Sequence, residues 1–270
     1  MIRNKSHLEK IVGESLNPQR AREQLLMLER SILKKIQGLR ILEVGSGYGL
    51  AVAIARTEFG ADAYGIEPGA DEFSGAYAVS RKALELAHLP PDVVLQGIAE
   101  DIPFPDSHFD CVFSSNVLEH VQNPQQVIDE SLRVLKPSGF LHIVVPNYGS
   151  WWEGHYGILW FPNLPLSLGK MYIRLQGRDP SFLETLQFIN HNWLGKMLTP
   201  YQGKIEVLGW GIDVWEERVL SLGFSEWSTL GKLKSILRFV HRVGLARVIV
   251  GVGKVLHWET PIILTVQKID

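Results

Sequence analysis

The sequence predicts a doubly wound α/β fold, with a mostly parallel sheet of about seven strands. Short and almost wholly apolar runs alternate with helix-like segments from residue 40 to residue 145. Glycines gather directly after the first run, at Gly45, Gly47 and Gly49. Apolar runs separated by helical patterns are typical of parallel strands covered on both faces, and a glycine turn after such a strand is typical of a ligand-binding loop.

The composition is that of an ordinary globular chain. Of the 270 residues 46% are apolar and 21% charged, which suits one large domain with insertions. The net charge of −2 gives no overall attraction for nucleic acid, and we expect none as a partner. Cys111 stands alone, so no disulfide forms within the chain and a cytoplasmic location is expected. The first ten residues lack the apolar core of a signal peptide, and no apolar run reaches the length of a membrane span.

The elements of the first half follow from apolar spacing and helix caps. Pro18 suits a first helical turn, and apolar residues then recur at helical spacing until Gly38. Asn123 and Pro124 form a cap and first turn for a later helix. The expected strands cover residues 40–44, 62–66, 93–96, 109–114 and 140–145, and the expected helices cover 18–37, 50–57, 71–88 and 124–135.

The second half has a different composition. All eight tryptophans lie between Trp151 and Trp258. We expect helices near 166–176 and 181–198, a helix at 213–222, a strand at 224–230 and a last strand at 261–267. The expected organisation is an N-terminal helical cap (1–38), a core (39–147), an aromatic-rich insertion or lid (148–209), a continued core (210–230), a basic amphipathic insertion (231–257) and the last core strand (258–270).

The glycine loop favours one class of cofactor over another. A dinucleotide-binding loop wants a third glycine where this chain has Leu50. Glu43 lies inside the motif, where a carboxylate repels a pyrophosphate but can receive the ammonium end of an amino-acid ligand. On charge, the loop therefore favours S-adenosylmethionine (SAM) over NAD. Glu67 ends the second strand, 23 residues after Val44, and its carboxylate can accept hydrogen bonds from both ribose hydroxyls.

Several phrases resemble the class I SAM-dependent methyltransferases, in particular the branch with ubiquinone- and menaquinone-biosynthesis enzymes. They are ILEVGSGYG, GIEPG, GIAEDIPFPDSHFDCVFSSNVLEHV and RVLKPSGFLHIVVPN, in order over residues 40–147. The resemblance implies a Rossmann-like methyltransferase fold and SAM as cofactor. Where many relatives carry an Asp that bonds the adenine amino group, this chain has Ile98. The cofactor-binding residues that it implies are Glu43, Gly45, Ser46 and Gly47 around methionine, Glu67 and Pro68 at the ribose, Ala99 and Glu100 beside adenine, and Asn116 and Val117 at the methionine end.

Methyl transfer is an in-line displacement, so the enzyme mainly positions the reactants, and a hydroxyl acceptor also benefits from a general base. Glu119 and His120 follow the fourth strand, where the methyl group is expected. His120 has the better pKa for a base, although a packing role at a helix start explains it equally well. The aromatic insertion adds His155, Tyr156, His191 and Tyr201, and forms either a lid or its own small core. The histidines show no paired metal-ligand spacing, so we expect no metal.

Residues 227–258 hold six Lys or Arg and no Asp or Glu. A basic amphipathic helix within 232–257 can lie on an anionic membrane, although a packed helical hairpin or a dimer contact is the favoured interpretation. The sequence thus predicts a SAM-dependent methyltransferase acting on a small molecule, a lipid or a glycan, with oxygen as the methylated atom. A non-catalytic SAM-binding scaffold and an NAD-dependent oxidoreductase stay as alternatives.

Overall fold

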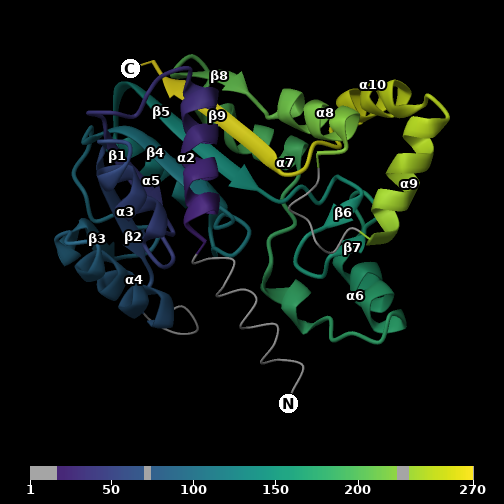
Figure 1. Cartoon of the computed structure of the whole chain (residues 1–270), viewed down its shortest axis with the longest axis horizontal. Helices are drawn as coiled ribbons and strands as arrows, with labels where there is room; N and C mark the ends of the chain where they lie inside the picture. Colours follow the sequence, from purple (N-terminus) through teal and green to yellow (C-terminus); the bar gives the residue numbers. More distant parts are fainter. Residues whose placement is uncertain (1–16, 70–73, 224–230, 270) are drawn as a thin grey trace.

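The computed structural model describes residues 17–69, 74–223 and 231–269, and it contains a seven-stranded sheet (Figure 1). The strand order is β3-β2-β1-β4-β5-β9-β8, so the direction of winding reverses between β1 and β4. Strands β1 to β5 pair in parallel, whereas β9 runs antiparallel to both of its neighbours, β5 and β8. The predicted mostly parallel, doubly wound sheet is therefore confirmed. The strands are β1 (Arg40–Val44), β2 (Asp62–Glu67), β3 (Val94–Gln96), β4 (Phe109–Ser115), β5 (Leu135–Val145), β8 (Ile205–Gly209) and β9 (Ile262–Lys268).

Helices cover both faces of the sheet, because successive strand residues point to opposite sides. Ile41 and Cys111 belong to one core, under α2 (Pro18–Ile32), α3 (Leu50–Thr57) and α4 (Ser74–Leu86). Leu42 and Val112 belong to the other core, under α5 (Pro124–Val134) and α7 (His191–Met197). All four side chains are fully buried. Strands buried on both faces explain the unbroken apolar runs of the sequence.

Helix ends agree closely with the caps that the sequence offers. Asn123 accepts a hydrogen bond from Gln126 N at the start of α5, as predicted, and Asn17, which was not predicted as a cap, accepts one from Gln19 N at the start of α2. Two ends differ from prediction by five residues. Helix α2 stops at Ile32 because Leu33 takes a left-handed conformation with φ +53°. Strand β5 already begins at Leu135, where a turn was expected to come first.

Helix α7 of the aromatic-rich insertion packs in the core of the sheet, whereas residues 148–188 form a separate part at one end of it (Figure 1). The small core of this part surrounds Trp160, which is fully buried. The single helix expected over 181–198 is wrong. Asn190 accepts a hydrogen bond from Trp193 N and starts a separate helix, α7. The insertion's other elements are β6 (Trp152–Glu153), β7 (Ile158–Leu159), α6 (Leu166–Leu175), η3 (Ser181–Thr185) and η4 (Thr199–Tyr201). Outside the insertion, a short 3-10 helix, η2 (Pro91–Val93), precedes β3.

The chain returns to the sheet earlier in the sequence than expected. Residues 205–209, placed in the insertion by the sequence, form β8 at the sheet edge, where three of the five side chains are exposed. The strand expected at 224–230 lies outside the described residues. The basic insertion becomes two helices, α9 (Gly231–Arg242) and α10 (Ala246–Leu256), which follow α8 (Ile212–Ser221). No helix among the described residues is long and apolar enough to cross a membrane.

Candidate active site

The glycine loop turns sharply at the carboxyl end of β1. Gly45 and Gly47 have φ of +72° and +53°, a region that glycine enters without strain. A Cβ atom on Gly45 would lie 2.3 Å from Val117 Cγ2, so this glycine is required by packing as well. A Cβ on Gly47 would meet no described atom within 4 Å. The loop is thus packed against Val117 at Gly45, and it has free space beside its backbone at Gly47.

A cleft of about 740 Å³ opens beside this loop. One wall is the glycine loop with the ends of β1 and β4, and the other is helix α2. The sequence interpretation missed α2 as a wall, because its polar residues resemble any solvated helix face. The lining includes Glu43, Gly45, Ser46, Gly47, Tyr48, Ser115 and Asn116, together with Arg20, Gln24 and Met27 from α2.

Glu43 is the unusual group of this cleft. Its carboxyl group is buried, and Oε1 accepts a hydrogen bond from Gln24 Nε2 at 3.2 Å. Oε2 has no hydrogen-bond partner among the described residues. Burial, opposed by the bond from Gln24 and assisted by the nearby charge of Glu67, raises the pKa of Glu43 to about 8. A cationic ligand group in the cleft would satisfy this carboxylate.

The residues expected around ribose and adenine lie on the neighbouring strand ends, outside the lining of this cleft. Glu67 is buried, and its Oε2 accepts a hydrogen bond of 2.7 Å from Gly47 N; burial raises its pKa, which that bond lowers in part. Pro68 follows Glu67 directly, and Ala99 is buried. The carboxylate of Glu100 accepts bonds from the backbone N–H groups of residues 122 and 123, so it braces the start of α5. A contact of Glu100 with adenine would therefore use its backbone.

Asn116 sits in a strained turn after β4. Its φ is +55°, which few residues other than glycine adopt, and its N–H donates to Val144 O at 2.9 Å. Strained backbone of this kind occurs at ligand sites more than elsewhere. The turn brings the side chain of Asn116 to the cleft and sends the following residues towards the aromatic insertion.

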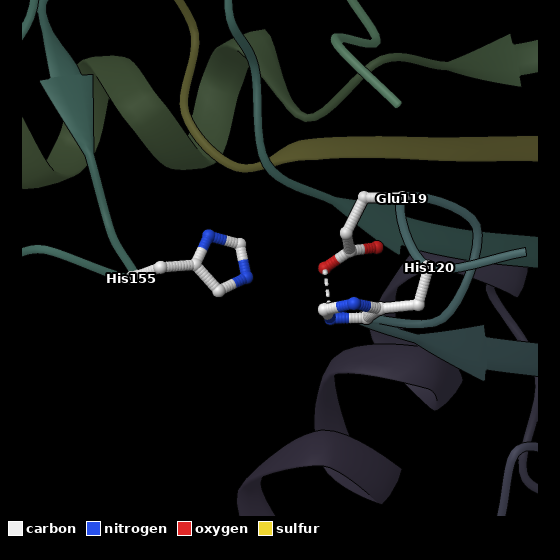
Figure 2. A group of neighbouring side chains, drawn as sticks. All are labelled: Glu119, His120 and His155. Atoms are coloured by element: carbon white, nitrogen blue, oxygen red, sulfur yellow. Dashed lines mark ion pairs between the residues drawn. The ribbon is translucent and has the colours of Figure 1, made fainter. Parts of the chain in front are cut away.

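Glu119, His120 and His155 come together beyond that turn (Figure 2). His120 Nε2 lies 3.8 Å from Glu119 Oε1, and the rings of His120 and His155 meet edge to face with centroids 5.5 Å apart. Glu119 is fully buried, and neither carboxylate oxygen has a hydrogen-bond partner among the described residues. Burial raises the pKa of Glu119 to about 7 and lowers the pKa of His120 to about 4.

Glu153, which the sequence interpretation missed, orients His155. Its Oε1 lies 2.8 Å from His155 Nδ1, and its two oxygens also accept the backbone N–H groups of residues 155 and 156. Burial lowers the pKa of His155, but the hydrogen bond and charge of Glu153 outweigh it, so the pKa lies above its ordinary value. The spacing Glu-x-His was the available signal.

The other predicted candidates lie elsewhere. The Tyr156 hydroxyl donates to Asp179 O at 2.7 Å and is not part of the group of Glu119, His120 and His155. The Tyr201 hydroxyl donates to Asp129 Oδ1. His191 stacks on His257 and lies 2.5 Å from Glu259 Oε1 through Nδ1, which makes a second group of metal-ligating side chains. Tertiary contacts therefore create two such groups that local spacing did not indicate.

Comparison with known proteins agrees with this arrangement. Residues 42–143 match the family described as methyltransferase domain, and this span holds the glycine loop, Glu67 and Asn116. An uncharacterised methyltransferase of Mycolicibacterium vanbaalenii is 34% identical over 146 residues, covering 53% of each chain. An uncharacterised protein of Mycobacterium tuberculosis strain H37Rv is 34% identical over 140 residues, covering 52% of this chain and 47% of the relative. The chain thus spans about half the length of the curated relatives that it matches.

Solved structures share the fold at low identity. The [4+2]-cyclase SpnF superimposes with a TM-score of 0.53 at 22% identity, over 92% of this chain and 81% of that one. A phosphoethanolamine N-methyltransferase of Haemonchus contortus, solved with S-adenosylmethionine, superimposes with a TM-score of 0.53 at 19% identity. The match covers 92% of this chain and 52% of that one. The sheet is therefore a Rossmann-like methyltransferase fold. Residues 42–143 match a methyltransferase domain, a class of domain whose usual cofactor is SAM.

Proposed function

We propose that this protein transfers a methyl group from SAM to an oxygen atom of a small molecule, lipid or glycan. The main support for this proposal is Glu43, which lines the cleft beside the glycine loop. Its buried oxygen Oε2 has no hydrogen-bond partner among the described residues. A buried carboxylate without a partner is costly, and the α-ammonium group of SAM is a cation of suitable size and charge.

The neighbouring residues fit the rest of the cofactor. The open space at Gly47 admits a ligand close to the backbone, and Asn116 offers an amide at the methionine end. Glu67 takes the ribose hydroxyls, with one oxygen fixed by Gly47 N–H. Ile98, which is 51% exposed, offers adenine an apolar surface in place of an acidic partner. SAM itself supplies the activated methyl group, so these residues mainly hold it in line with the acceptor.

The acceptor side lies beyond Asn116, at Glu119, His120 and His155. A hydroxyl acceptor must lose its proton as it is methylated, and Glu119 and His155, whose pKa values are raised, are better suited to receive it than His120, whose pKa is lowered. Phe182 contacts both imidazole rings, with centroid separations of 6.1 Å to His120 and 5.3 Å to His155. This apolar neighbour, which is itself 40% exposed, suits an acceptor with an apolar part.

Helices α9 and α10 form a surface that suits a lipid-linked acceptor. Phe239, Val248, Val252 and Val255 are between 43% and 76% exposed there, and Arg238 is exposed among them. Exposed apolar side chains beside cations favour contact with an anionic membrane surface. We propose that this helical pair rests on the cytoplasmic face of a membrane and brings the enzyme to its acceptor.

One observation supports a second function. SpnF shares this fold and is a cyclase, so the fold alone does not fix the reaction. A protein that binds SAM without transferring its methyl group is the corresponding alternative here. The NAD alternative is weaker, because Leu50 replaces the third glycine and Glu43 would repel a pyrophosphate.

Calorimetric titration of the full chain with SAM, S-adenosylhomocysteine and NAD tests the cofactor. We expect micromolar binding of SAM and its product, and none of NAD. Incubation with methyl-labelled SAM and lipid, glycan and small-molecule extracts then tests transfer. Binding without label in any product would support the non-catalytic alternative, and binding of NAD alone would overturn the proposal.

A further inference from the structure

We propose that Glu119, His120 and His155 bind a divalent transition-metal ion, with Zn²⁺ as the best match. The three side chains come from two distant parts of the chain: residues 119 and 120 follow β4, and residue 155 follows β6 (Figure 2). Each offers one ligand atom, and these atoms all lie within 4.8 Å of one another. Two imidazoles and one carboxylate are a common ligand set for a catalytic zinc ion.

The carboxylate of Glu119 independently favours a bound cation. The residue is fully buried, and both oxygens lack a hydrogen-bond partner among the described residues. A buried carboxyl group in that condition holds a proton or binds a cation, because an unpaired charge is costly to bury. A metal ion would satisfy it without any rearrangement of the backbone.

Each histidine has a ring nitrogen close to the other two ligand atoms. His155 Nδ1 is hydrogen bonded to Glu153 Oε1, which leaves Nε2 for a metal. Figure 2 shows this ring reaching towards Glu119 and His120. A carboxylate on the far nitrogen is the usual partner of a metal-bound histidine, because it fixes the tautomer and raises ligand basicity. His120 Nε2 lies 3.8 Å from Glu119 Oε1, so this nitrogen is close to the same carboxylate.

The distances leave room for an ion. Metal–ligand bonds of about 2.0–2.1 Å place tetrahedral ligand atoms roughly 3.3 Å apart. The ligand atoms of the three side chains lie within 4.8 Å of one another, and side-chain rotation would bring them to this spacing. The second group suits an ion less well. The rings of His191 and His257 are stacked 3.7 Å apart at 14°, so their in-plane lone pairs run side by side.

An ion held by three ligands keeps a fourth position for water or for an acceptor oxygen. A hydroxyl bound there would lose its proton more readily, because a metal lowers the pKa of a bound oxygen acid. The proton would pass to solvent, and the alkoxide oxygen would attack the methyl carbon as the carbon–sulfur bond of SAM breaks. This last step rests on the proposed function, whereas binding of the ion does not.

The test is titration of tag-free, chelator-treated full chain with ZnCl2, followed by calorimetry. We expect one Zn²⁺ per chain, and a visible absorption spectrum typical of tetrahedral Co²⁺ when Co²⁺ replaces it. Glu119→Gln and His155→Asn should each weaken binding at least about 100-fold; Asn keeps a donor for Glu153 and removes the ligand nitrogen. Glu153→Gln, which touches no metal, should weaken binding about 10–100-fold.

His257→Asn is the matched control, because it removes one imidazole from the second group, and we expect wild-type Zn²⁺ affinity. Thermal unfolding and SAM titration of every variant show that the fold and donor site are intact. Absence of Zn²⁺ binding in the wild type, or loss of binding in His257→Asn with retention in Glu119→Gln, would overturn the proposal. Zn²⁺ binding without SAM binding would instead contradict the proposed function and support the proposed metal site.

Discussion

Gln24 Nε2 donates to Glu43 Oε1 and lies equally close, at 3.2 Å, to Ser115 Oγ. One amide of helix α2 thus joins the ends of β1 and β4, the two strands between which the winding of the sheet reverses. Ligands of doubly wound sheets bind at this point. The helix therefore acts as a wall of the site and also sets the orientation of its buried carboxylate.

SAM affinity should depend on pH through Glu43. Its pKa is about 8 in the protein without ligand, so at lower pH the carboxyl group must release a proton before it pairs with an ammonium group. We expect affinity to rise about tenfold per pH unit from pH 6 to pH 8, and the dependence to disappear in Glu43→Gln. Calorimetry at several pH values measures this. Glu58→Gln, at an exposed pair with Arg22, serves as control, and a Glu43→Gln profile like the wild type would contradict the assignment.

The same carboxyl group predicts how the stability of the ligand-free protein changes with pH. The folded pKa of Glu43, about 8, lies above the ordinary value of 4.5, so the folded state keeps a proton that the unfolded chain releases. This contribution to the free energy of unfolding is complete below pH 4.5 and is lost as pH rises through 8. Urea unfolding of wild type and Glu43→Gln at pH 5 and pH 8.5 should show a smaller decrease in the variant. An equal decrease would assign the effect to other groups.

Substitutions of Gly38, Gly45 and Gly47, which all have positive φ, distinguish an effect on packing from an effect on ligand binding. Gly47→Ala and Gly38→Ala should each lower the free energy of unfolding by about 1–2 kcal/mol, because both have positive φ and open space at Cβ. Only Gly47→Ala should weaken SAM binding. Gly45→Ala adds a clash with Val117 and should destabilise more than either. Chemical unfolding and SAM titration measure both effects, and SAM affinity unchanged in Gly47→Ala would place the cofactor elsewhere.

Two glycines of α10 test how this helix is held. A Cβ on Gly253 would lie 2.2 Å from Trp215 Cη2 in α8, whereas a Cβ on Gly251 would meet no described atom within 4 Å. We expect Gly253→Ala to destabilise by about 1–3 kcal/mol through overpacking. Gly251→Ala should stabilise by about 0.5–1 kcal/mol, because alanine favours a helix. Thermal unfolding measures both, and similar effects of the two changes would argue against the contact with Trp215.

Membrane contact through the same helices predicts binding to vesicles. The wild type should sediment with vesicles that contain anionic phospholipid and less with neutral ones, and added salt should weaken binding. Replacement of Val248 and Val255 together by Ser should reduce it, because both side chains are more than half exposed. Leu33→Ser changes a highly exposed apolar residue at the end of α2, far along the chain from these helices, and should leave vesicle binding unchanged. Equal binding of all three proteins would exclude this surface.

Much of the first half was predictable from the sequence, because its strands are buried on both faces. Strand β1 and helix α3 coincide with their predicted ranges, since glycines and an unbroken apolar run mark their limits. Strand β8 escaped prediction because an edge strand with exposed side chains shows no apolar run. The contact of His155 with Glu119 depends on how the insertion docks: Gln187 N donates to Glu119 O at 2.7 Å. No local spacing reports such a contact. The site assignments themselves stay predictions.

The position of β9 has a consequence for synthesis on the ribosome. This strand lies between β5 and β8 in the sheet, although it follows both in the chain. Strand β8 is at the edge and pairs with β9, so it has no place in the sheet until α8, α9, α10 and then residues 262–268 have been made. The five strands around the cofactor loop can assemble early, but the other side of the sheet must wait. A ribosome that stops before β9 would release a protein with an open β5 edge, which is a target for aggregation or proteolysis.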